Sequence, residues 1–357
     1  AKGPLENQKY ASTRRVQITN QHCISNSIMS NKYFKYTLVL LSSLIQIGDF
    51  KKVMVVTSLD EFSEDMKVLE LFDFETLKWR SVEKSDSPAP LSAAYRAESL
   101  KPGTARLVEN HAVLEYELKN GLSLELARYS EDVMGSATLE YGDTLCIVGG
   151  YDSSKKSLKN EVLCWNPLNL RKKAGDAEAN GRRDSGSWVA LPPMNVGRHQ
   201  PGAVVMDGKL YVAGGYDTKT HKFISSVEVF DDITQRWYQM APMNHARAGL
   251  RLINSKGKLY AIGGWRKRDY LSVVEEYDPF TDSWSEVSNM NIPRASFGAI
   301  VNENDIYVVG GKKGFRQSDE LRSMEKYTPS EDKWSTENLP EMPHIRGPTM
   351  ATLVNDF

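Results

Sequence analysis

The sequence predicts an all-β fold made of one four-stranded unit used several times, because the same landmarks recur at nearly constant spacing. An apolar run ends in Gly-Gly, an aromatic residue follows 13 to 16 residues later, and in three units a tryptophan comes 7 residues after that. The landmarks are the diglycines Gly149-Gly150, Gly214-Gly215, Gly263-Gly264 and Gly310-Gly311, then Trp165, Phe230, Tyr277 and Tyr327, then Trp237, Trp284 and Trp334. In the first unit Trp188 comes 23 residues after its aromatic, as if 16 residues had been inserted. A period of about 48 residues is typical of propeller blades.

Within one unit, the residue pattern predicts two β-hairpins. In "GAVVMDGKLYVAGG" two β-rich runs flank Asp207-Gly208, a strong signal for a tight hairpin turn. The segment "SSVEVFDDITQRWYQM" has alternating apolar residues, a polar turn and a strand that carries the tryptophan. Four short strands form a sheet that cannot bury both faces alone, so we expect these sheets to stack radially into a propeller.

The repeated unit resembles the kelch repeat, which has the same diglycine, Tyr or Phe, and Trp landmarks. The chain also carries the Pro-Met…Arg step of that family, in Pro193-Met194 before Arg198 and in Pro242-Met243 before Arg247. The resemblance is specific over residues 134–340. It implies a β-propeller that recognises other proteins through its loops, although the fold alone does not name the partner.

Two further blades are predicted before residue 134, where the landmarks are degenerate. Thr57-Ser58 stands where a diglycine would stand, and Phe72 and Trp79 follow at the spacing of the repeat, which predicts a blade at 53–80. The segment "AVLEYELKNGLSLELA", centred on Asn120-Gly121, predicts a hairpin by its turn chemistry. The expected fold is therefore a six-bladed kelch-type β-propeller with four-stranded antiparallel blades, two of them degenerate.

The domain organisation follows from this count of blades. Residues 1–35 are polar and are expected to form an irregular N-terminal arm, and the propeller is expected to span 36–357. A C-terminal strand at 348–354, paired with 52–57, would close the ring and remove two open edges. The alternative is that residues 44–48 supply that strand. The insertion at 171–187 is polar and rich in glycine and charge, so we expect it to be mobile.

Charge and cysteine content limit the range of functions. The formal net charge is −1, which gives no general attraction to nucleic acid or to a membrane. The chain has three cysteines, and Cys146 lies in an apolar strand, where we expect a buried free thiol rather than a disulfide. The apolar run at 37–47 is too short to span a bilayer. We expect a cytoplasmic protein associated with the cytoskeleton.

No local motif points to catalysis, so we expect no enzyme, no metal and no cofactor. The diglycines lack the Lys-Ser/Thr of a nucleotide-binding loop, and the six histidines never occur at i, i+2 or i, i+4. Some kelch-like propellers are copper-radical oxidases, whose site needs a cysteine cross-linked to a tyrosine. Cys146 precedes a diglycine inside a strand, which is a poor position for that cross-link.

One candidate binding site is formed by arginines that recur just before the first strand of a blade. They are Arg198, Arg247, Arg294 and Arg346. In kelch-like propellers such arginines lie near the central channel and contact acidic partner segments, and guanidiniums suit carboxylates. The alternative is that each arginine binds a carbonyl of the neighbouring blade. The sequence leaves both open.

The loops that follow the diglycines are a second candidate surface, because all of them carry cations and should lie on one face. The cations are Lys155, Lys156, Lys159, Lys219, Lys222, Arg266, Lys267, Arg268, Lys312, Lys313 and Arg316. The densest loop is "WRKRDY" at 265–270, whereas the corresponding loop of the first blade, "LDEFSEDMK", is acidic. Charged loops are usually just solvated. A basic rim of this kind would also suit an acidic protein surface.

The resemblance implies protein–protein interaction, and two classes of kelch protein fit. We expect a propeller that binds and cross-links actin filaments, as scruin-like proteins do, with filamentous actin and neighbouring copies of the chain as partners. The alternative is the substrate-recognition kelch domain of a BTB-kelch ubiquitin-ligase adaptor. The two degenerate blades, the enlarged loop and the absence of a BTB-like segment favour the actin hypothesis.

Overall fold

The chain divides into two units, residues 1–49 and 50–357. In a computed structural model of the chain, the described residues all lie in the second unit. They are 51–58, 68–84, 103–109, 112–129, 133–142, 144–166, 188–344, 347 and 349–356. The predicted arm at 1–35, the alternative strand at 44–48 and the insertion at 171–187 lie outside the described residues.

Six antiparallel sheets form the main framework of the second unit, and we number them as blades 1 to 6 in chain order. Blade 1 contains β30 (Thr349–Asp356), β1 (Lys51–Ser58), β2 (Val68–Asp73) and β3 (Lys78–Glu83), and blade 2 contains β4 (Thr104–Glu109), β5 (Ala112–Glu117) and β6 (Ser123–Arg128). Blade 3 contains β8 (Ala137–Tyr141), β9 (Thr144–Val148), β12 (Val162–Trp165) and β13 (Trp188–Leu191).

Blades 4 to 6 repeat one four-stranded pattern. Blade 4 contains β14 (Gly202–Met206), β15 (Lys209–Ala213), β18 (Val227–Asp231) and β19 (Arg236–Met240). Blade 5 contains β20 (Arg251–Ser255), β21 (Lys258–Ile262), β24 (Val274–Asp278) and β25 (Ser283–Val287). Blade 6 contains β26 (Gly298–Asn302), β27 (Asp305–Val309), β28 (Met324–Thr328) and β29 (Lys333–Ser335).

Short hairpins stand between the second and third strands of blades 3 to 5. They are β10 (Tyr151–Asp152) with β11 (Ser157–Leu158), β16 (Tyr216–Asp217) with β17 (Lys222–Phe223), and β22 (Trp265–Arg266) with β23 (Asp269–Tyr270). The strand β7 (Val133–Met134) pairs with β10, and blade 6 has a 3-10 turn, η3 (Gln317–Asp319), in place of a hairpin. Within the described ranges, no helix is long and apolar enough to cross a membrane.

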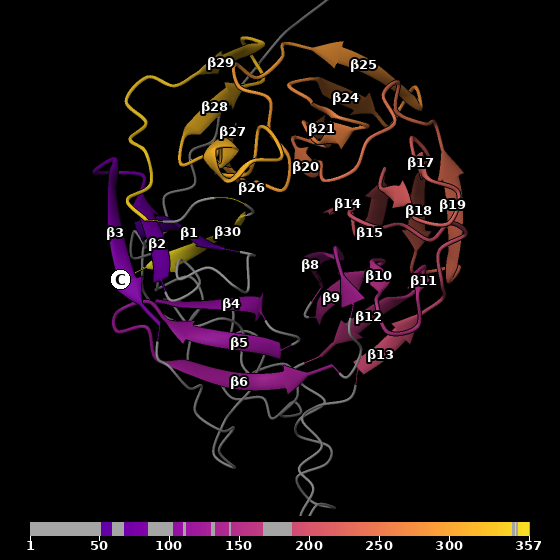
Figure 1. Cartoon of the computed structure of the whole chain (residues 1–357), viewed down its shortest axis with the longest axis horizontal. Coiled ribbons are helices and arrows are strands. Elements are labelled where there is room, and N and C mark those ends of the chain that lie inside the picture. The colour runs from indigo at the N-terminus through magenta and orange to yellow at the C-terminus, as the bar shows by residue number, and fades with distance from the viewer. Residues whose placement is uncertain are drawn as a thin grey trace, which may run out of the picture. The chain divides into compact units, whose positions relative to one another are not determined.

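The six blades follow one another around a common axis, as Figure 1 shows. In each blade one edge strand lies nearest the axis, and these inner strands are β30, β4, β8, β14, β20 and β26. The outer edges are β3, β6, β13, β19, β25 and β29. The prediction of an all-β, six-bladed propeller is confirmed.

The ring is closed by two strands that are about 300 residues apart in the chain. β30 pairs antiparallel with β1 from Lys51 opposite Asp356 to Ser58 opposite Thr349, which is the pairing that closure by the C-terminal strand requires. Thr349 also ties β30 to blade 6, because its hydroxyl donates to the carbonyl of Val309 at 2.9 Å and accepts from the backbone N–H of Gly298 at 2.9 Å.

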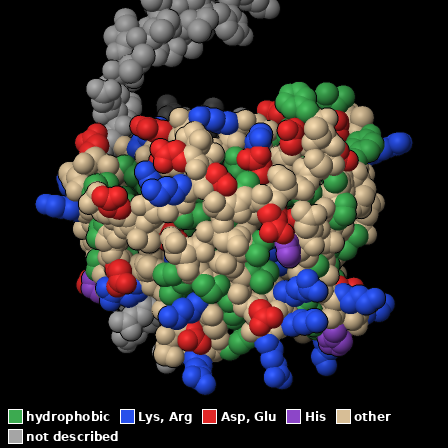
Figure 2. Space-filling view, turned by 90° about the horizontal axis from the view of Figure 1, so that it is seen from above, with side chains coloured by type: hydrophobic (Ala, Val, Ile, Leu, Met, Phe, Trp, Pro, Cys, Tyr) green, Lys and Arg blue, Asp and Glu red, His purple; other side chains and the backbone are tan. Residues whose placement is uncertain are grey.

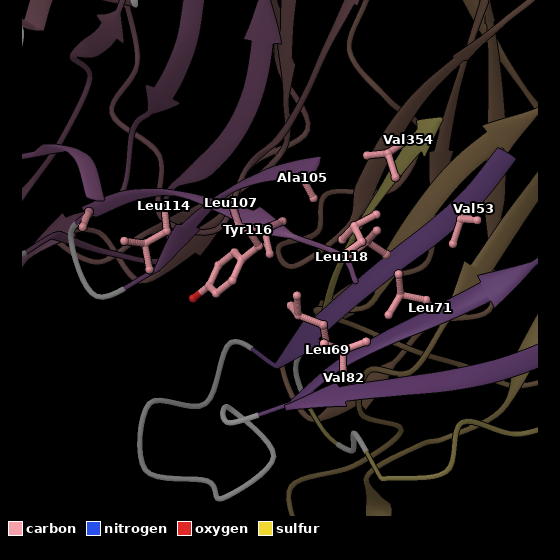
Figure 3. Close-up of a cluster of buried hydrophobic side chains, with 12 residues drawn as sticks. Val53, Leu69, Leu71, Val82, Ala105, Leu107, Leu114, Tyr116, Leu118 and Val354 are labelled. Atoms are coloured by element: carbon pink, nitrogen blue, oxygen red, sulfur yellow. The ribbon is translucent and has the colours of Figure 1, made fainter. Parts of the chain in front are cut away.

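Blade 2 is the most degenerate blade, with three strands among the described residues instead of the expected four. The predicted hairpin is present, because β5 and β6 are joined by a turn in which Asn120 Oδ1 accepts the backbone N–H of Leu122 at 3.0 Å. Figure 3 shows how apolar side chains hold this blade against blade 1: Leu69 and Leu71 of β2 lie in one buried cluster with Tyr116 of β5. Apolar packing therefore replaces the lost landmarks of the repeat.

The repeat tryptophans connect each outer strand to the blade before it. Each indole N–H donates to a backbone carbonyl at or just after the outer strand of the preceding blade. The pairs are Trp79 to Pro340, Trp188 to Arg128, Trp237 to Pro192, Trp284 to Ala241 and Trp334 to Ser288, at 2.7 to 3.1 Å. The fixed spacing of Trp after Tyr or Phe thus places a donor at four seams between blades, and Trp188 makes the same bond at a fifth seam despite the longer loop before it.

Two cysteines contradict the expectation of a free thiol. Cys146 on β9 stands directly opposite Cys164 on β12, and the two sulfurs form a disulfide between buried side chains. The prediction was wrong because the pairing of two strands across a long loop, not the apolar context of one strand, decides which cysteines meet. Disulfides persist mainly in oxidising compartments, so the cysteine content no longer supports an intracellular location.

Removing a repeat tryptophan should weaken the ring. Trp284 is 8% exposed, so Trp284→Ala is expected to lower the free energy of unfolding by about 3–5 kcal/mol. Trp284→Phe keeps most of the packing and loses the N–H donor, which should cost about 0.5–1.5 kcal/mol. Urea denaturation measures both. Phe280→Ala is the control, because this ring is 98% exposed; equal losses for Trp284→Ala and the control would contradict the assigned role.

The disulfide should contribute measurably to stability. It closes a loop with a sequence separation of 18, for which loss of chain entropy in the unfolded state predicts about 3 kcal/mol. The double change Cys146→Ala with Cys164→Ala should therefore lower the denaturation midpoint, as should a reducing agent acting on the unmodified protein. Peptide mapping without reductant should recover the linked pair. Free thiols at both positions in the oxidised protein would contradict the bond.

Candidate partner-binding surface

Each regular blade has two kinds of connection at opposite ends. In blade 4, Met206 pairs with Lys209 and Asp231 with Arg236 at one end, whereas Ala213 pairs with Val227 at the other. Blades 5 and 6 follow the same registers. We call the end with the two tight turns the turn face, and the end with the long loop between the second and third strands the loop face.

The recurring arginines are buried links between blades. The backbone of Arg247 belongs to blade 4, because its carbonyl accepts the N–H of Gly215 at 2.8 Å and its own N–H donates to Ile224 at 3.2 Å. Its side chain enters blade 5, where the guanidinium donates to the carbonyl of Val273 at 2.8 Å and to Glu275 Oε1 at 2.7 Å. One residue thus binds two blades at once.

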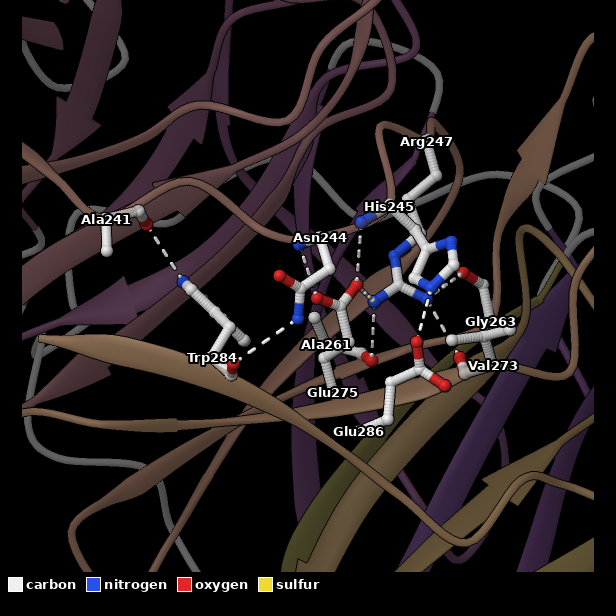
Figure 4. Close-up of polar contacts among 10 residues, drawn as sticks. All are labelled: Ala241, Asn244, His245, Arg247, Ala261, Gly263, Val273, Glu275, Trp284 and Glu286. Carbon is white, nitrogen blue, oxygen red and sulfur yellow. Dashed lines mark hydrogen bonds and ion pairs between the residues drawn. The ribbon is translucent and has the colours of Figure 1, made fainter.

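Glu275 completes this link by also binding the segment that carries the arginine. Its carboxylate accepts the backbone N–H groups of Asn244 at 2.6 Å and His245 at 3.2 Å, as Figure 4 shows. Both Arg247 and Glu275 are 0% exposed. Burial lowers the pKa of Arg247 to about 10, and the negative charges of Glu275 and Glu286 oppose that shift, so the guanidinium stays charged at neutral pH.

The same link recurs at the two neighbouring seams. Arg198 pairs with Glu228 at 3.0 Å between blades 3 and 4, and Arg294 pairs with Glu325 at 2.8 Å between blades 5 and 6. All four side chains are 0% exposed. The prediction that Arg198, Arg247 and Arg294 bind a partner is wrong, because these guanidiniums are enclosed and bound to carbonyls and carboxylates. Arg346 lies outside the described residues.

The diglycines are needed because the backbone of each linking arginine passes close to them. Gly263 has φ +57°, and a Cβ there would come within 2.5 Å of the carbonyl oxygen of Arg294. The first glycines of the preceding two pairs meet the carbonyls of Arg198 and Arg247 in the same way. The first glycine therefore makes room for the backbone of the next linking arginine.

Blade 3 lacks both members of the pair. Met134 pairs with Tyr151 in the same way as His199 pairs with Tyr216. Val133 directly precedes Met134, as Arg198 directly precedes His199, so Val133 stands at the position of the arginine. Leu163 precedes Trp165 by two residues, as Glu228 precedes Phe230, so it stands at the position of the glutamate. Loss of the arginine together with the glutamate indicates that each residue depends on the other.

The basic loops, in contrast, are accessible. The side chains of Lys155, Lys156, Lys219, Lys222, Arg266, Lys267, Arg268, Lys313 and Arg316 are exposed on the loop face. Lys312 is partly buried and pairs with Glu320 at 3.0 Å. Lys159 is buried and lies 3.6 Å from Asp152, so it is not a surface cation. Figure 2 shows lysine and arginine side chains gathered along one rim of the propeller.

Aromatic side chains from three blades gather among these cations. Phe223 of β17 lies 4.9 Å from Tyr216 and 4.9 Å from Trp265 of β22, measured between ring centroids. Phe315 of blade 6 lies 6.3 Å from Trp265 and 5.1 Å from Tyr270, and it is 65% exposed. We call these five aromatics, with the cations of residues 216–223, 265–270 and 312–316, the aromatic–basic surface.

The sequence prediction found the cations of this surface and missed that its aromatics meet. Trp265 and Tyr270 are the first and last residues of the "WRKRDY" loop, and Tyr216 follows a diglycine. Phe223 and Phe315 come from two other loops, and only the ring geometry brings them to Trp265. The usable signal was an aromatic residue in each of three loops that share one face.

A metal centre was the alternative kind of site that the sequence raised. Among the described residues, no group of three or more His, Cys, Asp or Glu side chains could hold a metal ion. Cys146 and Cys164 cannot supply the cross-link of a copper-radical site, since they are bonded to each other.

The fold and this surface define a propeller for protein–protein interaction, and comparison with known proteins agrees. The family model "KLHDC2/KLHL20/DRC7 Kelch-repeats domain" matches residues 135–356. The chain therefore belongs to the kelch-repeat family. The structure titled "Structure of YjhT" is similar with a TM-score of 0.53 at 17% identity, over 70% of this chain and 84% of that one, which supports the fold alone.

Several curated relatives match over short segments. Kelch-like protein 28 of Homo sapiens is 36% identical over 24% of this chain and 16% of the relative, and Kelch-like protein 9 of Mus musculus is 41% identical over 22% and 13%. Kelch-like protein 40 of Xenopus laevis is 30% identical over 37% and 19%. The chain thus spans less than a fifth of each of these relatives.

The buried arginine–glutamate pair can be tested by a double-mutant cycle that introduces the residues of blade 3. Arg247→Val and Glu275→Leu should each cost about 3–5 kcal/mol of unfolding free energy, because each leaves a buried charge without its partner. The double variant should cost less than the sum by about 1 kcal/mol or more. The surface pair Lys209 and Asp231, at 3.4 Å, is the control and should show little coupling. Additive losses for the buried pair would refute the coupling.

Proposed function

We propose that this propeller binds an acidic segment of another protein on its aromatic–basic surface. The observation that carries the proposal is the meeting of aromatic rings from blades 4 to 6 with a dense set of exposed cations; Phe315 is exposed and the other four rings are partly buried. Aromatic residues and arginine are the types enriched at interface hot spots, and cations on a rim steer an acidic partner to the surface. The two parts together can supply both affinity and orientation.

The cations of this surface are available for a partner. Arg266, Lys267 and Arg268 are exposed at the tip of the β22–β23 hairpin, and none of the three makes an ion pair with the described residues. Trp265 at the base of the same hairpin is held in place, because its indole N–H donates to Gln200 Oε1 at 2.9 Å. The hairpin thus presents exposed charges beside a fixed ring, which is an arrangement suited to binding rather than to stability.

Two kinds of acidic partner fit this surface. A short acidic peptide is the partner that a BTB-kelch adaptor would hold, and the compact group of aromatic rings beside Trp265 favours it. If the partner is such a peptide, it lies on the aromatic–basic surface and not on the buried arginines. A filament of actin is the second candidate, favoured by the spread of exposed cations over the loops of blades 3 to 6, from Lys155 to Arg316.

Charge reversal at the densest loop tests the proposal. The triple variant R266E/K267E/R268E should weaken binding of an acidic partner roughly tenfold or more, because attraction becomes repulsion. The denaturation midpoint should stay unchanged, since exposed loop charges contribute little to stability. Raising the salt concentration should weaken binding by the unmodified protein in the same direction. Cosedimentation with filamentous actin and fluorescence anisotropy of a labelled poly-glutamate peptide measure the two candidate partners.

The control has the same change in charge on the turn face. R236E/K256E/K333E reverses three exposed cations there and should bind like the unmodified protein. Binding of the peptide but not of the filament would support an adaptor-like role in which the partner is a short acidic peptide. Binding of the filament but not of the peptide would support actin as the partner. If both triple variants bind equally well across the salt series, the aromatic–basic surface is not the contact.

A further inference from the structure

The turn face carries two large apolar side chains that nothing in the propeller covers. Ile233 is 94% exposed and Phe280 is 98% exposed. They occupy equivalent positions on neighbouring blades, each two residues after an aspartate that ends the third strand, Asp231 in blade 4 and Asp278 in blade 5. Single exposed apolar residues are common on protein surfaces, but here the same turn position carries one on each of two adjacent blades.

Both side chains are presented by an ordered backbone. Asp231 Oδ1 accepts the backbone N–H of Ile233 at 3.0 Å, and Asp278 Oδ1 accepts that of Phe280 at 2.8 Å. Such side-chain turns fix the direction of the tip residue. Ile233 and Phe280 are thus held outward, and covering them would cost little further ordering.

The two tips are also acidic. Residues 231–236 and 278–283 carry four aspartates and one arginine. Asp232 and Asp282 are exposed, and Asp282 also accepts the backbone N–H of Ala241, which follows the outer strand of blade 4, at 2.9 Å. The two tips therefore place the exposed Asp232 and Asp282 in the same turns as Ile233 and Phe280, while Lys209 pairs with Asp231 at 3.4 Å and Lys256 is exposed in the other tight turn of blade 5.

The opposite end of the same blades has the complementary chemistry. The aromatic–basic surface presents one exposed ring, Phe315, and four partly buried rings among eight cations and two aspartates over residues 216–223, 265–270 and 312–316. Figure 2 shows this polarity, with the basic side chains along one rim and large hydrophobic side chains projecting at the other. The strand registers place the two surfaces at opposite ends of the blades.

We propose that the chain associates head to tail, with Ile233 and Phe280 of one copy seated on the aromatic–basic surface of a second copy. The aspartates beside the two tips then face the cations of the loops, so apolar burial and charge pairing act at the same contact. Two different surfaces meet in this contact, and each copy keeps one free end. Repetition therefore gives an open row of propellers rather than a closed dimer.

This inference rests on the proposed function, because it uses the same aromatic–basic surface as the acceptor. It adds the consequence that a second copy and an acidic partner compete for that surface. Association of copies would therefore decrease when an acidic partner is present at saturating concentration.

Sedimentation velocity over a range of concentrations tests the proposal. The unmodified chain should show a mass that rises with concentration, and raising the salt to about 1 M, where screening reaches within ~3 Å, should reduce it. A turn-face variant, I233S/F280S, and the loop-face variant R266E/K267E/R268E should each stay at the monomer mass of 40.2 kDa. Leu122→Ser, at a turn tip of blade 2 that is 55% exposed, is the control and should associate normally.

Mixing the two defective variants gives the decisive measurement. The turn-face variant keeps an intact loop face and the loop-face variant keeps an intact turn face, so an equimolar mixture should form a one-to-one complex of twice the monomer mass and nothing larger. A monomeric unmodified chain at every concentration, or a mixture that stays monomeric while the unmodified chain associates, would overturn the proposal.

A separate readout distinguishes failure of this proposal from failure of the proposed function. The turn-face variant should bind the poly-glutamate peptide at least as tightly as the unmodified chain, whereas the loop-face variant should lose both peptide binding and self-association. Peptide binding without self-association would retain the proposed function and reject the head-to-tail contact. Self-association without peptide binding would retain the head-to-tail contact and reject the proposed function.

Discussion

A buried guanidinium that belongs to one blade and binds the next is the interaction on which this ring depends. Arg247 shows why the other features of the repeat are needed. Its backbone packs against the diglycine of its own blade, which excludes a side chain at Gly214, and its charge inside the protein requires Glu275. The tryptophans make a second connection at the outer edge, where Trp284 binds Ala241. Neighbouring blades are thus joined both near the diglycine and at the rim.

Most of the fold could be predicted from the sequence, because the repeat keeps its landmarks at fixed spacing and hairpin chemistry is local. Even degenerate blade 2 was predicted from the turn at Asn120-Gly121. The role of the arginines could not be predicted, since a guanidinium that recurs beside a channel and one that recurs inside a seam have the same spacing. The bond between Cys146 and Cys164 depends on pairing across a loop. The aromatic group depends on three loops, and only the ring brings Phe223 and Phe315 to Trp265.

Blades 1 to 3 show that the ring tolerates other means of attachment. Blade 3 has Val133 and Leu163 in place of the charged pair and holds two of its strands together with the disulfide. Blades 1 and 2 share a large apolar cluster, in which Leu71 and Tyr116 are buried. An apolar seam avoids the cost of removing charges from water. A charged seam fixes its geometry through directional bonds. The regular blades, 4 to 6, use the directional kind, and they are also the blades that carry the aromatic–basic surface.

The pairing of β30 with β1 has a consequence for how the protein is made. A ribosome produces β1 early and β30 last among the strands of this ring, so the edge of β1 waits for a partner that is about 300 residues away. Contacts between such distant segments form slowly, and an open strand edge can pair with another chain in the meantime. Blades 3 to 6 are built from consecutive segments and can assemble as they emerge. Nascent chains halted before β30 would therefore be the species most in need of a chaperone.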